Sequence, residues 1–249
     1  MLHLTFIGMF GACVGSLTSM LIYRLPLINL EKKSDISLFF PRSSCPNCKK
    51  QLTNLMLIPV LSFIWQKGIC GFCRKKIKFS YLINEITHIF VAILTAFYFG
   101  VTIEGLLFYM IFFILFILFF LDLKYLYLPF FLNLSLLPIG LLTNYLFTTF
   151  TSLYFSFLGM VIGYAFLWLV NAAYKILNSR DGIGGGDFIL LAGLGSIFGI
   201  VSLGPILLIG SSISICIYFI YNEHNKKEIP FGSGLILGAI LYYILKIIF

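Results

Sequence analysis

The chain has 249 residues, of which 60% are hydrophobic and 10% are charged, and its mean hydropathy is +1.04. Soluble domains carry about 25% charged residues, so this composition excludes a soluble globular protein and predicts an integral membrane protein. The 17 Lys and Arg residues outnumber the 9 Asp and Glu residues and give a net charge of +8. These charges fall between apolar stretches, which indicates orientation in a bilayer rather than nucleic-acid binding.

Apolar stretches long enough to cross a bilayer follow one another along the chain. A transmembrane helix needs about 20 apolar residues, and the first candidate runs from about Leu4 to Tyr23. Positive charge follows this stretch from Arg24 onward, which is typical of a retained anchor rather than a cleaved signal peptide. Seven further spans are predicted at about 82–99, 106–121, 126–147, 153–174, 188–203, 206–221 and 231–249. We separate the sixth and seventh spans at Gly204-Pro205, because proline ends or kinks helices.

The basic residues orient this arrangement. The stretch from Arg24 to Tyr81 holds 11 of the 17 Lys and Arg residues. Positive residues favour the cytoplasmic side, so we predict a cytoplasmic location for this stretch and an outside location for both termini. The same topology places five more basic residues on the cytoplasmic side, namely Lys124, Lys175, Arg180, Lys226 and Lys227. The predicted fold class is an all-α polytopic protein of the plasma membrane, with about eight transmembrane helices and a small cytoplasmic insertion.

Three parts are predicted along the chain: a first transmembrane helix at 1–23, a cytoplasmic cysteine-rich domain at 24–81 and a membrane-embedded core of about seven helices at 82–249. In the middle part, Cys45 and Cys48 are separated by 21 residues from Cys70 and Cys73. Two such pairs typically supply the four thiolates of a tetrahedral zinc site. Such a site has no open position for catalysis, so we predict a structural zinc ion. The alternative is two reducible cysteine pairs without metal.

Two aspartates stand at the cytoplasmic ends of predicted spans. Asp122 ends the third span, and Asp187 begins the sixth span after a run of glycines. Two carboxyl groups at the same depth can share one proton, so that the charged group activates water and the neutral group protonates the leaving group. The alternative is that each aspartate is a solitary helix cap paired with Lys124 or Arg180.

Several motifs occur in a specific order along nearly the whole chain. The two acidic segments are Asp122-Leu123 with Leu128-Pro129, and Gly184-Gly185-Gly186-Asp187-Phe188 followed by Leu190-Leu191-Ala192. Around them stand Gly15-Ser16, Ile22-Tyr23-Arg24-Leu25-Pro26, the two cysteine pairs, Ile58-Pro59-Val60-Leu61-Ser62, Glu85 and Ile229-Pro230-Phe231-Gly232. This ordered set resembles the prepilin (type IV) leader peptidases, a family of membrane-embedded aspartic proteases with a G-x-G-D signature.

The resemblance implies an endopeptidase that removes the basic leader from type IV prepilins, or from pilin-like precursors of secretion or competence, at the cytoplasmic face. Asp122 and Asp187 would be the catalytic pair, with Gly184, Gly185, Gly186 and Glu85 close to the substrate. It also implies N-methylation of the new terminus, with S-adenosylmethionine as the methyl donor. The expected partners are these precursors and the lipid bilayer, with no nucleic acid and with the oligomeric state left open.

Two positions depart from the family pattern, because Ile189 stands where lysine is usual and Phe130 where aspartate is usual. Two other classes of function stay open. In a coupled transporter, Glu85, Asp122 and Asp187 would form a proton or cation relay, although they cluster at one membrane face rather than at the midplane. In a non-catalytic assembly protein, the cysteine-rich insertion would dock a partner of the pilus or secretion system.

Overall fold

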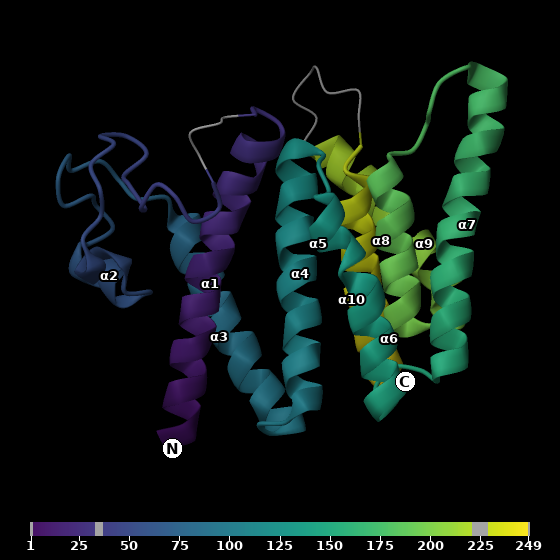
Figure 1. Cartoon of the computed structure of the whole chain (residues 1–249), viewed down its shortest axis with the longest axis horizontal. Helices are drawn as coiled ribbons and strands as arrows, with labels where there is room; N and C mark the ends of the chain where they lie inside the picture. Colours follow the sequence, from purple (N-terminus) through teal and green to yellow (C-terminus); the bar gives the residue numbers. More distant parts are fainter. Residues whose placement is uncertain (1, 33–36, 221–228, 249) are drawn as a thin grey trace. The chain divides into compact units, whose positions relative to one another are not determined.

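The computed structural model describes residues 2–32, 37–220 and 229–248, and all regular elements in these ranges are helices (Figure 1). Seven helical stretches in the described ranges are long and apolar enough to cross a membrane, and an eighth apolar helix is shorter. The chain is therefore a multi-pass membrane protein, and the predicted all-α class is confirmed. Two of the residues used above to orient the chain, Lys226 and Lys227, lie outside the described residues.

The chain divides into two compact units, Met1–Tyr109 and Met110–Phe249. The first unit contains α1 (Leu2–Asn29), η1 (Asn54–Leu57), α2 (Leu61–Trp65), α3 (Phe79–Phe99) and the start of α4 (Ile103–Tyr125). The second contains the rest of α4, α5 (Phe130–Leu134), α6 (Leu136–Phe147), α7 (Leu153–Asn178), α8 (Gly185–Phe198), α9 (Ile200–Ile220) and α10 (Phe231–Ile248).

In the first unit, α1 and α3 pack through glycines. A Cβ atom added to Gly11 would lie 2.7 Å from the carbonyl oxygen of His88, and one added to Gly15 would lie 2.6 Å from the Cα atom of Glu85. Backbones this close exclude any side chain at the two glycines, which is a common way for helices to pack inside membranes. The spacing of four residues puts both glycines on one face of α1.

Buried polar side chains add hydrogen bonds inside the first unit. The ring nitrogens of His88, on α3, each lie 3.0 Å from a hydroxyl oxygen, one of Thr18 on α1 and the other of Tyr109 on α4. Asn84 donates to the hydroxyl oxygen of Ser19 at 2.9 Å. Because such groups find no water in a bilayer core, these bonds restrict how α1 and α3 can rotate against each other.

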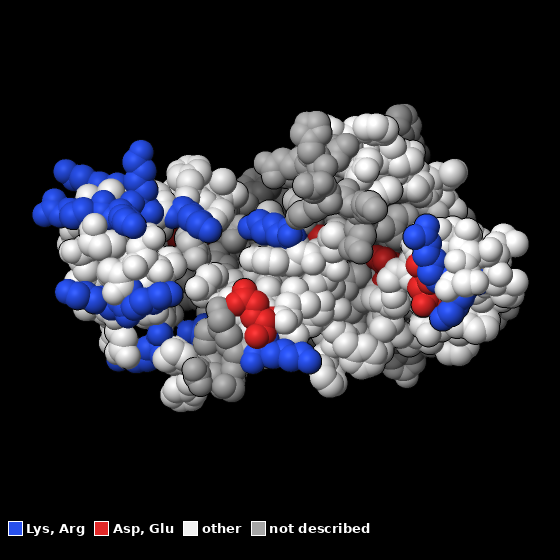
Figure 2. Space-filling model, turned by 90° about the horizontal axis from the view of Figure 1, so that it is seen from above, with Lys and Arg blue, Asp and Glu red and all other residues white. Residues whose placement is uncertain are grey.

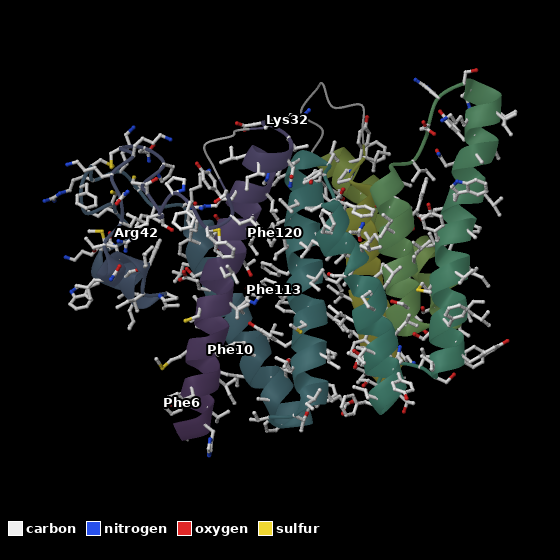
Figure 3. All side chains as sticks on the ribbon, in the orientation of Figure 1. Phe6, Phe10, Lys32, Arg42, Phe113 and Phe120 are labelled. Atoms are coloured by element: carbon white, nitrogen blue, oxygen red, sulfur yellow. The ribbon has the colours of Figure 1, made fainter. Side chains whose placement is uncertain are left out.

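The cysteine-rich segment connects the C-terminal end of α1 to the start of α3. Phe6 and Phe10 lie toward the N-terminal end of α1, whereas Lys32 follows its other end and Arg42 belongs to the cysteine-rich segment (Figure 3). The positive charges labelled here thus lie beyond the C-terminal end of α1, as expected for the cytoplasmic side of a helix that crosses a bilayer.

Arg24, buried near the C-terminal end of α1, ties the cysteine-rich segment to that helix. Its guanidinium group donates to the carbonyl oxygens of Ser37, Leu38 and Pro41 at 2.9, 2.9 and 2.6 Å. A guanidinium group carries its donors in a fixed fork, so these three bonds define the path by which the segment leaves α1.

In the second unit, α8 lies in the middle. The buried residues of α8 are Phe188 and all those from Leu190 to Ile197. This helix contacts α5, α6, α7, α9 and α10. A helix that is apolar all round belongs in the interior of a bundle. At about 1.5 Å per residue its length is about 21 Å, which is less than the roughly 30 Å of a bilayer core.

The sequence predicts the break between α8 and α9 at Gly204-Pro205, and this prediction is wrong. The break lies at Gly199, which has a φ of 84°, and Pro205 is inside α9. Glycine adopts such a positive φ without steric conflict, so it ends the helix here. Pro205 is tolerated because it stands early in α9, where its missing N–H removes a single helical hydrogen bond.

Asn144, on α6, satisfies the backbone at the C-terminal end of α8. Its side-chain NH2 donates to the carbonyl oxygens of Ser196 and Ile197 at 3.0 and 2.8 Å, and the Ser156 hydroxyl also donates to Ser196. Its side-chain oxygen accepts from the backbone N–H of Phe150 at 3.1 Å. One buried amide therefore joins the end of α8 to the connection between α6 and α7.

The α7–α8 contact depends on Gly195, because a Cβ atom added there would collide with the carbonyl group of Gly159. We expect Gly195→Ala to lower the unfolding temperature of the protein in detergent. The control is Gly204→Ala, because a Cβ atom at Gly204 meets nothing within 4 Å and alanine is favoured over glycine inside helices by about 1 kcal/mol. Thermal unfolding measured by scanning fluorimetry distinguishes the two variants, and equal effects would contradict this account of the contact.

Candidate active site

Asp122 lies in the last turn of α4 and is buried. One of its carboxylate oxygens, Oδ2, accepts a hydrogen bond of 2.5 Å from the backbone N–H of Ser233. Ser233 is the third residue of α10, and the first N–H groups of a helix have no partner within the helix. Asp122 therefore caps α10 from another helix, and the partial positive charge at this helix end stabilises its carboxylate.

Asp187 is the third residue of α8. Its own backbone N–H donates to the carbonyl oxygen of Gly184 at 3.0 Å, which closes the first turn of the helix. Among the described residues, its buried carboxyl oxygen Oδ1 has no hydrogen-bond partner. Burying a polar oxygen without a partner is unfavourable by about 1–3 kcal/mol, so this atom is suited to form a hydrogen bond with water or with a substrate.

The two carboxyl groups meet at Gly232, the second residue of α10. A Cβ atom added to Gly232 would lie 3.2 Å from Cγ of Asp122 and 3.2 Å from Oδ1 of Asp187. The Cγ atom of Asp122 and the Oδ1 atom of Asp187 are therefore separated by at most twice 3.2 Å. Two carboxylates this close repel each other, which favours the state in which the pair holds one proton.

The glycines before Asp187 provide space rather than unusual backbone angles. The described glycines with positive φ all lie elsewhere in the chain. A Cβ atom on Gly184 would lie 3.2 Å from Oδ2 of Asp187, and one on Gly186 would lie 3.0 Å from Cβ of Leu128. A Cβ atom on Gly185 would meet nothing within 4 Å. The chain is thus tightly packed at Gly186, while open space borders Gly185.

The residues from Gly182 to Gly186 form a glycine segment that leads into α8. Asn133, a fully buried residue of α5, holds the C-terminal end of this segment. Its side-chain NH2 donates to the carbonyl oxygen of Gly186 at 2.7 Å. Gly186 directly precedes Asp187, so this bond fixes the backbone from which the Asp187 side chain projects.

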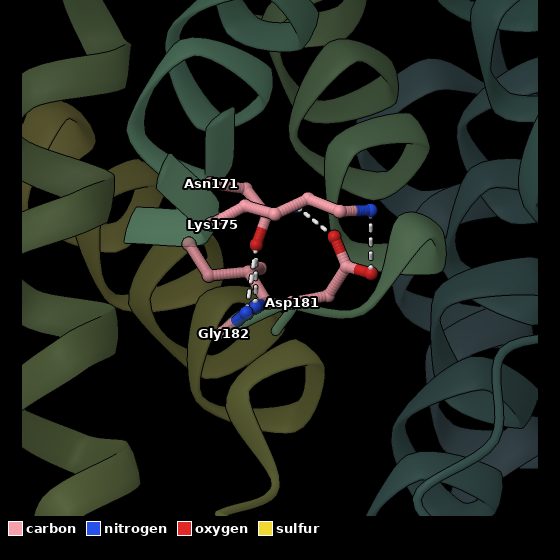
Figure 4. A network of polar contacts seen from close by, with 5 residues as sticks. Asn171, Lys175, Asp181 and Gly182 are labelled. Atoms are coloured by element: carbon pink, nitrogen blue, oxygen red, sulfur yellow. Dashed lines mark hydrogen bonds and ion pairs between the residues drawn. The ribbon is translucent and has the colours of Figure 1, made fainter. Parts of the chain in front are cut away.

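Asn171, on α7, holds the other end of the glycine segment (Figure 4). Its side-chain oxygen accepts from the backbone N–H groups of Gly182 and Ile183 at 2.8 and 3.0 Å, and its NH2 group donates to Asp181 at 3.0 Å. Lys175 pairs with the other oxygen of Asp181 at 3.1 Å. The hydrogen bond from Asn171 and the nearby Lys175 lower the pKa of Asp181, so this carboxylate stays charged and is part of the support for the segment.

Sequence reasoning proposed Asp122 and Asp187 as a pair but did not find Asn133, Asn171 or Ser233. An amide inside a predicted apolar span is itself a signal, because an unpaired polar group is unfavourable in a bilayer. That signal applies to Asn133 and Asn171, whereas the backbone contact of Ser233 leaves no mark in the sequence.

Glu85, the third predicted carboxylate, belongs to the first unit. It is buried on α3, and its side chain accepts a hydrogen bond of 2.7 Å from the backbone N–H of Val60. Val60 has a φ of 61°, which a β-branched residue rarely adopts. The Glu85 carboxyl group thus contacts the residue that directly precedes α2 and also the hydroxyl of Ser16, and its place beside a substrate stays a prediction.

The two C-x-x-C pairs fold into matching turns. The Cys45 N–H donates to the carbonyl oxygen of Lys50, and the Lys49 N–H donates to that of Cys45. The second pair repeats both bonds, from Cys70 to Lys75 and from Arg74 to Cys70. The basic residue after each pair also repeats, with a φ of 60° at Lys49 and 59° at Arg74. The chain therefore builds the same turn twice from local sequence.

The matching turns bring the four sulfur atoms together. All four lie within 4.8 Å of one another, and those of Cys45 and Cys73 are 3.9 Å apart. Zinc–sulfur bonds of about 2.3 Å in a tetrahedron place the sulfurs about 3.8 Å apart. The backbone N–H groups of Cys73 and Phe72 lower the pKa of the Cys70 thiol to about 6, whereas burial and the neighbouring thiols raise the pKa of Cys73 to about 11. Cys70 is therefore the first of these two thiols to become the thiolate that metals bind. The cluster fits a tetrahedral metal ion.

Comparison with known families divides the chain in the same way as its contacts do. The model of the bacterial peptidase A24 N-terminal domain matches residues 9–99. The model of the type IV leader peptidase family matches residues 109–220. The two matches meet close to the boundary between the two compact units.

Relatives named prepilin leader peptidase/N-methyltransferase align with almost the whole chain. The protein from Aeromonas hydrophila is 32% identical over 96% of this chain and 89% of its own length. The protein from Legionella pneumophila is 33% identical over 94% and 88%, and that from Bacillus subtilis (strain 168) is 31% identical over 98% and 94%. No solved structure matches the chain. The sequence similarity shows that this chain belongs to the type IV leader peptidase family, as its ordered motifs indicated.

Proposed function

We propose that this protein is a membrane-embedded aspartic endopeptidase that removes the leader from prepilins or pilin-like precursors. The observation that carries the proposal is the meeting of Asp122 and Asp187 at Gly232, in a chain that belongs to a peptidase family. The relatives' name supplies the class of substrate.

The two aspartates would divide the work of peptide hydrolysis. Because Asp122 accepts a backbone N–H donor, we assign it the charged form, which takes a proton from water as the water oxygen attacks the scissile carbonyl carbon. Asp187 would carry the shared proton and donate it to the carbonyl oxygen through its otherwise unpartnered Oδ1. When the tetrahedral intermediate collapses, the C–N bond breaks and a proton passes from the pair to the leaving amine.

The cut would take place at the cytoplasmic face. Asp122 stands at the C-terminal end of α4 and Asp187 at the N-terminal end of α8, both in the second unit. Positive residues favour the cytoplasmic side. The many Lys and Arg residues between Arg24 and Tyr81 therefore support an N-terminus outside the cell and both aspartates at the cytoplasmic face. A basic leader would remain on that side, and the open space at Gly185 would receive the substrate backbone beside the carboxyl pair.

We extend the proposal to N-methylation of the new terminus with S-adenosylmethionine, because the relatives carry this second activity in their name. The structure offers no support for placing the methyl donor. A pocket of about 120 Å³ in the first unit, lined by Ile7, Phe10, Thr95 and Tyr109 among others, has no charged residue in its wall. It does not fit a polar, charged cofactor, so we derive no step of methyl transfer from it.

We expect Asp122→Asn and Asp187→Asn each to lower leader removal by about 10³-fold or more, because either change removes a group that transfers a proton in the reaction. The assay incubates the purified protein with a candidate prepilin and S-adenosylmethionine and reads the mass of the product. The same spectrum shows whether one methyl group has been added to the new terminus. The control Asp181→Asn removes a carboxylate that supports the same segment but is outside the pair, so its effect on leader removal should be far smaller than that of either pair variant.

Processing at the wild-type rate by either Asp122→Asn or Asp187→Asn would exclude the mechanism. A precursor that stays intact with the wild-type protein as well would favour the non-catalytic assembly role.

The carboxyl pair and the substrate space can be tested separately through two glycines. We expect Gly232→Ala to lower kcat by about tenfold or more, because the new methyl group would push both carboxyl groups from their positions. Gly185→Ala should instead raise KM and leave kcat almost unchanged, because its methyl group enters open space that we assign to the substrate. Steady-state kinetics on a leader peptide measures both constants, and a fall in kcat alone for Gly185→Ala would contradict the substrate assignment.

We propose zinc as the metal of the cysteine cluster, held by Cys45, Cys48, Cys70 and Cys73. The purified protein should contain about one zinc ion per chain, and Cys48→Ser should lose it because three thiolates bind more weakly than four. Mass spectrometry of the metal content is the measurement. Cys13→Ser is the matched control, because Cys13 is an exposed cysteine outside the cluster. A metal-free wild-type protein purified without chelators would contradict the assignment.

A further inference from the structure

The segment made of η1 and α2 exposes large apolar side chains although it belongs to the hydrophilic part of the chain. Neither helix has a buried residue. On α2 the exposed fractions are 59% for Leu61, 63% for Ile64 and 78% for Trp65, and on η1 Leu55 reaches 67%. Contiguous apolar surface of this kind on a small segment marks a place of contact with a membrane or a protein.

The opposite side of α2 is fixed to α3. The Phe63 ring packs edge-on against the Phe79 ring, with 6.0 Å between their centres. At the start of α2, the Val60 N–H donates to the Glu85 carboxyl group. These two contacts set the rotation of α2, so that the exposure of Ile64 and Trp65 is a property of the fold.

The contact with Glu85 also sets the depth of α2 in the membrane. Glu85 is six residues beyond Phe79, the first residue of the α3 span, which corresponds to about 9 Å along the helix. The polar headgroup layer on each side of a bilayer is about 5–8 Å thick. In agreement, α2 lies beside the helices of the first unit rather than beyond their ends (Figure 1). The start of α2 is therefore near the boundary between headgroups and acyl chains.

The charges around α2 match this depth. Lys and Arg side chains gather over the cysteine-rich segment (Figure 2), and the exposed ones that follow α2 are Lys67, Arg74, Lys75, Lys76 and Lys78. Lysine and arginine stems pass along apolar surface while their charges reach lipid phosphates. Tryptophan is enriched at the same boundary, and Trp65 has the most exposed side chain of α2.

A protein partner fits this surface less well. A helix of five residues is about 7.5 Å long, whereas a stable protein interface covers about 800 Å² on each partner. A bilayer needs no such area, because the lipid surface around α1 and α3 continues onto the segment.

We propose that η1 and α2 insert into the headgroup–acyl boundary of the bilayer and thereby hold the four-cysteine cluster at the membrane surface. The inference goes beyond the proposed peptidase activity and does not depend on it. It concerns where the first unit touches lipid.

The two tryptophans of the chain, Trp65 and Trp168, allow a direct test in proteoliposomes of the full-length protein. Trp168→Phe leaves Trp65 as the only tryptophan, and its fluorescence is measured with lipids brominated at shallow or deep positions of the acyl chain. We expect shallow bromine to quench Trp65 several-fold more strongly than deep bromine, with little quenching by aqueous iodide. Trp65→Phe is the matched control, because Trp168 lies in the α7 span and should respond more to deep bromine.

Three results would overturn the proposal. Strong iodide quenching of Trp65 without lipid quenching would place α2 in water. Protection from both iodide and brominated lipid would show that a protein, either a partner or a second copy of the chain, covers the surface. Near-equal responses of Trp65 and Trp168 to shallow and deep bromine would likewise contradict a boundary position for α2.

Discussion

The second unit depends on one constraint: α8 is too short to cross a bilayer and its C-terminal end is buried, so the last carbonyl groups of this helix cannot reach water. Other helices must supply the hydrogen bonds that water would supply to an exposed helix. Asn144 does so at the C-terminal end, and Asn133 reaches the first turn. The position of Asp187 follows from this arrangement, since it stands three residues into a helix that is fixed at both ends.

The carboxyl pair is built from helix ends that are far apart in the sequence. Asp122 comes from the end of α4, Asp187 from the start of α8, and Ser233 donates from the start of α10. The starts of α8 and α10 both present partial positive charge, which stabilises a single negative charge shared by the pair at the edge of a membrane. Glycine at position 232 then allows both carboxyl groups to approach the same point.

Local patterns in the sequence predict some of this well. The cysteine turns follow from short repeats, and the positions of Asp122 and Asp187 at helix ends follow from the lengths of the apolar runs beside them. Contacts between distant segments are different: Gly232, Asn133 and Asn171 acquire their roles only when α10, α5 and α7 pack around α8. The misplaced helix break has the same origin, because Gly199 and Gly204-Pro205 are both plausible ends until packing selects one of them.

The contacts described for the two carboxyl groups come from Gly184, Gly232 and Ser233, all within Met110–Phe249. The family comparison also divides the chain near residue 109 into two segments that are recognised separately. In evolutionary terms the protein is modular. The described contacts of the two aspartates constrain residues of the second segment alone, so the cysteine-bearing half can change in sequence without altering those contacts.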